Sequence, residues 1–404
     1  MEKINNNFEL IKKESDKFLM GNYLPFNIAY ASGKGSTLTD TNGKKYVDFF
    51  SAIAVNSLGY NHPEIVKTIK RQAKKPLLTS NFFYNEHKAS LAKALTDGNE
   101  NKKVFFSNSG AEANECAIKL SRKFFHNQSI KRFKFISTLN SFHGRTLATV
   151  TATGQPKYNL PYAPLPNGFG DYIPFNDIPA LEKALADGEV CALIIECLQG
   201  EGGLHTASQE YMTACRELTK KHGALLIIDE VQTGIGRTGK MFCYEHFNIE
   251  PDIVCVAKAL GGGLPIGACI AKAEVASAFS VGDHGTTFGG SPFVCAVANT
   301  VVSTVKSNGF LESVISTGEH FKQRLREINS PLIEEVKGLG LMLGAKISDK
   351  IVAKDIVVSM LKKGFIINAC GNNTLRFVPP LIITKKEIDS MVCALGEVLK
   401  MFID

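Results

Sequence analysis

Two polar residues with catalytic potential directly follow apolar segments of the sequence. Lys258 comes after residues 253–257, and Asp229 comes after residues 224–228. A desolvated lysine amine loses its proton readily and then acts as a nucleophile or forms a Schiff base. An aspartate in such a place often caps a turn, but its carboxylate can also pair with a protonated ring nitrogen. Lys258 and Asp229 are therefore the first candidates for catalysis.

A predicted helix over residues 109–127 offers a place for an anion. Its apolar positions fall on one face, and Ser109 with Glu112 fits a capping box at its start. Gly110 and Ala111 are small, so they leave backbone N–H groups free where the helix dipole favours negative charge. A bound phosphate and a plain helix cap both explain this segment.

Phe142 supplies an aromatic side chain shortly after the strand-like residues 133–137. A lone phenylalanine usually belongs to a core, but its ring can also stack on another ring. A phosphate cradle, a stacking aromatic, a carboxylate for a ring nitrogen and an imine-forming lysine are what pyridoxal 5′-phosphate requires. These residues together predict a pyridoxal-phosphate site.

The elements that must position these residues form an α/β pattern. Short apolar runs alternate with helical segments, which predicts a mostly parallel sheet. The expected strands span residues 104–107, 133–137, 192–195, 224–228 and 253–257. Ligands bind at the carboxyl ends of strands in open α/β sheets, so one edge collects the groups named above, together with Glu196.

The last hundred or so residues predict a smaller α/β domain. We expect helices over 310–328, 353–363 and 385–402, and strands over 338–346, 365–368 and 374–378. We expect an N-terminal segment (1–61) that packs with the small domain, a large cofactor-binding domain (62–298) and a small C-terminal domain (299–404).

Residues 234–239 match G-x-G-x-x-G, the dinucleotide-binding fingerprint. That fingerprint lies in the tight turn after a strand and opens a helix. Here five residues separate it from the preceding apolar run, and residues 240–247 show no clear helical periodicity. We therefore do not expect nucleotide binding at this segment.

Composition excludes several classes of protein. The net charge of +7 is dispersed over 404 residues, so no basic stripe indicates nucleic-acid binding. Residues 1–18 lack an apolar run behind a basic start, and no segment has the roughly 20 apolar residues of a membrane span. We expect a cytoplasmic protein. Ten cysteines without a C-x-x-C pair predict reduced thiols, and nine dispersed histidines predict no metal site.

The chain resembles the class III, or ornithine-type, aminotransferases of pyridoxal-phosphate fold type I. The similarity covers roughly Gly21 to the C-terminus, and its most specific part joins residues 226–234 to residues 257–263. It continues through residues 109–113, 142–146, 199–203 and 284–290. The resemblance implies a large domain with a mostly parallel seven-stranded sheet and a smaller α/β domain.

The resemblance also implies roles for the cofactor-binding residues. Lys258 would form the internal aldimine and move the proton, and Asp229 would keep the ring nitrogen protonated. The other implied cofactor contacts are Phe142 and Val231 on the ring faces, Gln232 at the ring hydroxyl, and Ser109, Gly110 and Ala111 at the phosphate. Thr287 would reach the phosphate of the other subunit, which implies a homodimer with shared active sites.

Residues 153–158, 340–344 and 375–380 resemble the acetylornithine branch of this family. That likeness implies ping-pong transfer of the δ-amino group of N2-acetylornithine to 2-oxoglutarate, in arginine biosynthesis. Arg145 would bind the α-carboxylate of acetylornithine, and Arg376 that of glutamate or 2-oxoglutarate. Glu201 would pair with Arg376 when the donor presents only a terminal amine. Glu196 is the second acidic residue expected near the substrate.

The sequence leaves other amino donors and two other functions open, and it departs from the family pattern at two positions. Succinyl-diaminopimelate, succinylornithine, ornithine and 4-aminobutyrate are other ω-amines for the same chemistry. An aminomutase of the glutamate-semialdehyde type and a catalytically silent protein of this fold fit the retained residues less well. Cys197 replaces a usual proline and Ser291 a usual asparagine, which leaves local geometry open.

Overall fold

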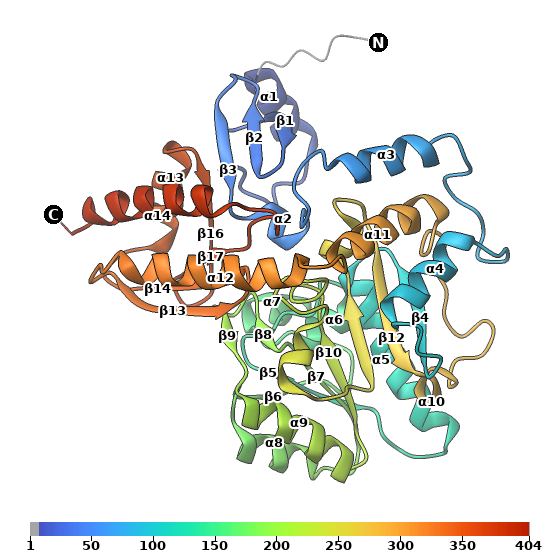
Figure 1. Ribbon diagram of the computed structural model, residues 1–404. Coiled ribbons are helices and arrows are strands. Elements are labelled where there is room, and N and C mark those ends of the chain that lie inside the picture. Colours follow the sequence, from blue (N-terminus) through green and yellow to red (C-terminus); the bar gives the residue numbers. More distant parts are fainter. Residues whose placement is uncertain (1–7, 404) are drawn as a thin grey trace.

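The computed structural model describes residues 8–403 (Figure 1). The side chains of its central strands alternate between two faces of a sheet, and each face is covered by a layer of helices. In β10 (Leu225–Asp229), Leu225 and Ile227 pack with α5 (Gly110–Asn127). Leu226 and Ile228 pack on the other face with α8 (Ile178–Leu185) and α9 (Gln209–Lys221). Because successive side chains of a strand point to opposite faces, a wholly buried strand lies between two helical layers.

The large sheet has seven strands in the order β4-β12-β11-β10-β7-β5-β6. β12 runs antiparallel to both of its neighbours, and the other neighbouring pairs are parallel. The strands besides β10 are β4 (Lys102–Ser107), β5 (Lys134–Thr138), β6 (Asp171–Ile173), β7 (Val190–Ile195), β11 (Ile253–Val256) and β12 (Gly267–Lys272). The predicted mostly parallel sheet and its five strands are confirmed.

The C-terminal part has its own four-stranded sheet, β13-β14-β17-β16. Its strands are β13 (Ile333–Leu339), β14 (Met342–Ile347), β16 (Asn368–Cys370) and β17 (Thr374–Phe377). Its helices, α12 (Phe310–Glu327), α13 (Ala353–Lys362) and α14 (Lys385–Lys400), confirm the three predicted ones. The single strand predicted over 338–346 is wrong: the chain reverses at Gly340, whose φ is 53°, and forms a hairpin.

The N-terminal strands join the C-terminal part of the chain. β1 (Tyr30–Lys34), β2 (Thr37–Asp40) and β3 (Lys45–Asp48) form one sheet with β15 (Phe365–Ile366), which pairs in parallel with β3. Figure 1 shows these blue strands beside the red helices. The predicted division at residues 61 and 298 stays a prediction, and the first seven residues of its N-terminal segment lie outside the described residues.

The remaining elements lie between and before these. The helices are α1 (Phe8–Phe18), α2 (Ser51–Ala54), α3 (Pro63–Gln72), α4 (Glu86–Leu95), α6 (Leu147–Ala152), α7 (Pro156–Asn159), α10 (Ala273–Ala276) and α11 (Pro292–Val305). The 3₁₀ turns are η1 (Leu160–Tyr162), η2 (Cys243–Phe247) and η3 (Lys258–Gly261), and β8 (Leu198–Gln199) pairs with β9 (His205–Thr206). Within residues 8–403, every helix is too short or too polar to traverse a bilayer.

The glycine-rich segment 234–239 joins the large and the C-terminal parts. It lies in a loop after β10 rather than in a strand-to-helix turn, so its setting differs from that of the dinucleotide fingerprint. The guanidinium of Arg237 is fully buried, and its Nη1 donates to the carbonyls of Leu341 (3.0 Å) and Pro379 (2.5 Å). This arginine therefore links the loop after Asp229 to the turn of the β13–β14 hairpin.

Candidate active site

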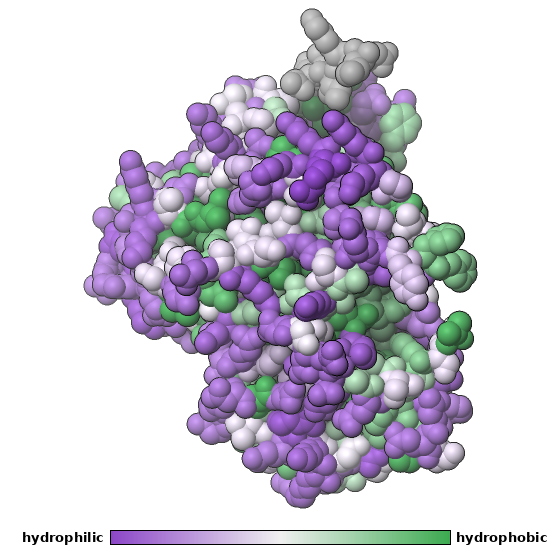
Figure 2. Space-filling model, turned by 45° about the vertical axis from the view of Figure 1, so that its right-hand side comes forward, coloured by the Kyte–Doolittle hydropathy of each residue, from purple (hydrophilic) through white to green (hydrophobic). Residues whose placement is uncertain are grey.

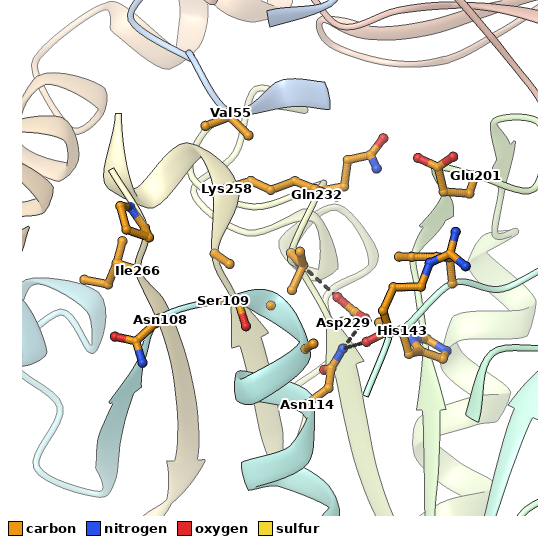
Figure 3. A pocket seen from close by; sticks show the side chains of 18 of the residues that line it. Val55, Asn108, Ser109, Asn114, His143, Glu201, Asp229, Gln232, Lys258 and Ile266 are labelled. Carbon is orange, nitrogen blue, oxygen red and sulfur yellow. Dashed lines mark hydrogen bonds and ion pairs between the residues drawn. The ribbon is translucent and has the colours of Figure 1, made fainter. Parts of the chain in front are cut away.

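The carboxyl ends of the parallel strands border a cavity of about 450 Å³. Figure 3 shows most of its lining side chains, which come from several elements around the large sheet and from Val55. Of the residues predicted from sequence, those that line it are Ser109, Gly110, Ala111, Phe142, Arg145, Glu196, Glu201, Asp229, Val231, Gln232 and Lys258. A cavity of this size suits a small cofactor together with a substrate.

Lys258 lies two residues after the end of β11 and begins the turn η3. Its backbone φ of 37° lies in the left-handed region, which costs energy for a residue with a Cβ. Among the described residues its amine has no hydrogen bond or ion pair, and its side chain extends into the cavity (Figure 3). Burial lowers the pKa of Lys258 from its ordinary value of 10.5, and the nearby Glu201 opposes this shift. The amine is thus poised to lose its proton.

Asp229 ends β10 and is held in place by three hydrogen bonds. Its Oδ2 accepts from Asn114 Nδ2 (2.8 Å) and lies 2.8 Å from His143 Nδ1, while its Oδ1 accepts from the N–H of Val231 (3.0 Å). Asn114 Nδ2 also donates to the carbonyl of His143 at 2.7 Å. The carboxylate therefore both caps a turn and is fixed at the cavity, so neither sequence interpretation excludes the other.

Asn114 and His143 were missed as site residues, although the sequence held a signal for each. His143 directly follows Phe142, and Asn114 lies four residues after Gly110, on the same face of α5. The Asn114 Oδ1 and His143 Nε2 atoms are buried without a partner among the described residues. A buried polar atom without a partner is costly, so these two atoms indicate an interaction still to be made.

The start of α5 presents backbone N–H groups to the cavity. Ser109 is the N-cap, and its Oγ accepts from the N–H of Glu112 at 3.2 Å. The Glu112 carboxylate accepts from the N–H of Asn108 (2.8 Å) instead of that of the N-cap, so only half of the predicted capping box forms. A Cβ on Gly110 would lie 2.6 Å from Val231, so only glycine permits this close approach. The first-turn N–H groups remain available to an anion.

Glu196 joins two loops at the cavity wall. Its Oε2 accepts from the N–H of Phe142 at 3.0 Å, and its Oε1 accepts from the N–H of Gly200 at 3.2 Å. Burial raises the pKa of Glu196 to about 7. The carboxyl group is thus occupied with backbone contacts, and the substrate contact predicted for it stays a prediction.

The two predicted substrate arginines have opposite surroundings. Arg376, on β17, is buried and does not itself line the cavity. Its guanidinium pairs with Glu201 and donates to Asn368 Oδ1 (2.9 Å) and to the carbonyl of Gly200 (3.0 Å). Arg145 is exposed at the cavity and, within residues 8–403, forms no ion pair. One arginine is therefore covered by a carboxylate, and the other is open to an anionic ligand.

Thr287 lies outside the cavity of its own chain. It is exposed on the loop after His284, where its neighbour Thr286 accepts from Asn108 Nδ2 at 3.1 Å. Its predicted contact with a second subunit is therefore not contradicted by its position.

The two residues that depart from the family pattern have local explanations: Ser291 is the N-cap of α11, and Cys197 is fully buried in the apolar core.

Val55 reaches the cavity through an unusual turn that sequence reasoning missed. The four preceding residues, Ser51 to Ala54, have φ values of 43°, 52°, 64° and 63°. Asp48 fixes the entry to this turn, because its Oδ1 accepts from the N–H groups of Phe50 (2.7 Å) and Ser51 (2.9 Å). A left-handed turn without glycine has no local sequence signal, since ordinary side chains disfavour it.

Glu230, next to Asp229 but outside the cavity, gives a prediction for stability. It is buried, accepts from Thr233 Oγ1 (2.5 Å) and the N–H of Tyr244 (2.9 Å), and burial raises its pKa from 4.5 to about 7. The folded state therefore holds this proton more tightly, so the stabilisation is present below pH 4.5 and is lost as the pH rises to about 7.

Glu230→Gln removes this titration. Between pH 4.5 and 7.5, we expect the free energy of unfolding of the variant to rise relative to the parent protein by roughly 3 kcal/mol. Denaturant unfolding at several pH values measures the difference, and the exposed Glu217→Gln provides the control. A difference that does not change with pH would show that folding does not raise the pKa of Glu230.

Comparison with known proteins places this site in a family. The model of the family Aminotransferase class-III matches residues 20–399. The acetylornithine aminotransferase of Caldanaerobacter subterraneus subsp. tengcongensis is 47% identical, covering 95% of this chain and 97% of its own. The succinylornithine transaminase of Yersinia pseudotuberculosis is 44% identical, covering 93% of each. The crystal structure of ornithine aminotransferase from Toxoplasma gondii superposes with a TM-score of 0.93 at 30% identity, covering 98% of this chain and 96% of that one.

Proposed function

The chain belongs to the class-III aminotransferases, and we propose that it transfers the δ-amino group of N2-acetylornithine to 2-oxoglutarate. The products are N-acetylglutamate 5-semialdehyde and glutamate, as in arginine biosynthesis. The observation that carries this proposal is the contrast between two arginines: Arg145 lines the cavity and is open, whereas Arg376 lies outside the lining and is covered by Glu201. The likeness to a curated acetylornithine aminotransferase supports the choice of donor.

The family implies pyridoxal phosphate, and the cavity fits this group. The free N–H groups of Gly110 and Ala111 suit its phosphate, the fixed carboxylate of Asp229 suits its ring nitrogen, and the unpartnered amine of Lys258 suits its aldehyde. Phe142 and Val231 would lie against the ring, and Gln232 would donate to its hydroxyl. When bound, the cofactor supplies a carbonyl for the amino group and a ring that withdraws electrons.

The protein's own residues then control binding and the proton. Burial keeps the Lys258 amine ready to take a proton from the substrate carbon and return it. Asn114 and His143 hold the Asp229 carboxylate in one orientation, so its negative charge stays directed at the ring nitrogen.

The arginines would let one site accept two differently shaped substrates. A guanidinium binds a carboxylate through two parallel hydrogen bonds, so the open Arg145 suits the α-carboxylate of the acylated donor. The Arg376–Glu201 pair leaves no cation for the donor's other end, which carries only an amine. When 2-oxoglutarate binds, Glu201 must release Arg376, which then binds the α-carboxylate of this acceptor.

A homodimer with shared sites also forms part of this proposal. Phe82, Phe83 and Tyr84 are three consecutive aromatic residues with 96%, 68% and 107% relative exposure. Asn81 donates to the carbonyls of Thr286 (3.0 Å) and Gly289 (3.2 Å), so these aromatics lie beside the loop that carries Thr287. Figure 2 shows green apolar groups that project from the surface among polar ones. An exposed apolar patch of this kind marks an interaction surface.

The cytoplasmic location stays a prediction.

A panel of amino donors tests the proposed reaction. With 2-oxoglutarate as acceptor, kcat/KM is measured for N2-acetylornithine, N2-succinylornithine, succinyl-diaminopimelate, ornithine and 4-aminobutyrate. We expect acetylornithine to exceed ornithine and 4-aminobutyrate by about tenfold or more, which is about 1.4 kcal/mol of transition-state binding. The similarity to a succinylornithine transaminase makes N2-succinylornithine the second candidate. If free ornithine or 4-aminobutyrate leads, the reaction class stands and the proposed donor is wrong.

A further inference from the structure

Arg145 is held by aromatic rings rather than by a carboxylate. Its guanidinium carbon lies 4.1 Å from the ring centre of Tyr158 and 5.2 Å from that of Phe142. The two rings meet edge to face, with centres 5.9 Å apart. A cation over a ring face is attracted by the ring quadrupole, so these rings form a platform, here called the aromatic shelf, beneath the arginine.

Such a shelf orients the guanidinium without neutralising it. A carboxylate partner would occupy the in-plane N–H donors of Arg145 and compete with an incoming carboxylate. An aromatic ring does not accept strong hydrogen bonds from these N–H donors as a carboxylate does, so they stay open to an incoming ligand. Arg376 shows the contrasting arrangement, since Glu201, Asn368 and the Gly200 carbonyl occupy its donors.

The segment that carries Tyr158 is itself fixed against the loop that carries Arg145. Gln155 Nε2 donates to the carbonyl of Ser141 at 3.0 Å, and the N–H of His143 donates to Thr153 Oγ1 at 2.9 Å. Asn159 Nδ2 donates to the carbonyl of Thr153 at 3.1 Å, which fixes the short helix α7. The position of Tyr158 relative to Arg145 is thus determined by buried hydrogen bonds on both sides.

We propose that Tyr158 is a specificity-determining residue, which holds Arg145 in the orientation that binds the α-carboxylate of an N-acylated diamino acid. This inference rests on the proposed function and deepens it. Phe142 contributes to the same shelf and lies against the cofactor site, so the shelf also sets the distance between Arg145 and the reacting centre. Residues 153–158, singled out as a subfamily mark, thereby acquire a physical role.

The balance between KM and kcat tests this proposal, because a residue that only orients Arg145 affects substrate binding more than the chemical step. For Tyr158→Leu we expect KM for N2-acetylornithine to rise about three- to tenfold, with kcat changed less than KM. Tyr158→Phe retains the ring and should restore KM, while the exposed Tyr162→Leu serves as a matched control with no expected effect.

A double-mutant cycle makes the test independent of the parent protein's preferred donor. In an Arg145→Ala background, Tyr158→Leu should cause no further loss with the best donor that carries an α-carboxylate. An additive loss, a fall in kcat that exceeds the rise in KM, or a Phe variant as impaired as the Leu variant would each overturn the proposal. Failure of the proposed function would appear elsewhere, as a wrong donor preference in the unmodified protein.

Discussion

Lys258→Ala is expected to lower kcat by about 10⁵-fold or more, because it removes both a nucleophile and the group that moves the proton. Lys258 has no hydrogen-bonding partner among residues 8–403, and its pKa is lowered by burial, so no neighbour is arranged to replace its amine. The variant should also lose the visible absorbance that arises from the bond between a bound cofactor and a lysine. Steady-state kinetics and an absorbance spectrum of the variant measure both effects.

The exposed Lys240→Ala is the matched control for this experiment and should leave both measurements unchanged. Lys258→Arg adds a second comparison, because it keeps a positive charge but offers no amine of lowered pKa. If the Lys258→Ala variant retains both turnover and absorbance, Lys258 is not the lysine that bonds to the cofactor and moves the proton.

Asp229→Asn is expected to lower kcat by about 10² to 10⁴-fold while the protein stays folded. The variant keeps the shape of the side chain but removes the buried negative charge that His143 and Asn114 hold in place. Removing one partner of a buried ionic contact costs about 3–5 kcal/mol, and this loss falls on the step that needs an electron-withdrawing ring. Turnover at saturating substrate measures the effect, and a fluorescence titration measures any loss of cofactor affinity.

Asp252→Asn distinguishes a catalytic effect from the general cost of losing a buried carboxylate. Asp252 is nearly as buried as Asp229, but it lies at the start of β11 and pairs with Arg216 and Lys272 away from the cavity. We expect this variant to lower the free energy of unfolding with little change in kcat. If Asp229→Asn loses less than tenfold in kcat, the proposed charge pairing is incorrect.

Strands with bulky apolar residues could be predicted, whereas strands defined by their neighbours could not. The run Leu225 to Ile228 is continuously apolar because helices cover both faces of the sheet. β12 was missed because Gly267, Ala268 and Cys269 are small, and its place between β4 and β11 depends on antiparallel pairing with both. β6 has only three residues and gives no periodic signal.

The sequence by itself determined the reaction class. Lys258, Asp229 and the first residues of α5 each stand where an element ends or begins, and a local pattern reveals such a boundary. Because parallel strands bring their carboxyl ends to one edge, placing these groups at strand ends was enough to bring them together.

Only the tertiary structure decided how those groups are held. The hydrogen bonds of Asp229 with Asn114 and His143, the aromatic shelf under Arg145 and the buried guanidinium of Arg237 all join segments that are distant in sequence or meet through loops. Such contacts depend on side-chain direction and on which neighbour competes for each donor. Local periodicity carries no information about either, so these features follow from packing and from the need to satisfy buried polar groups.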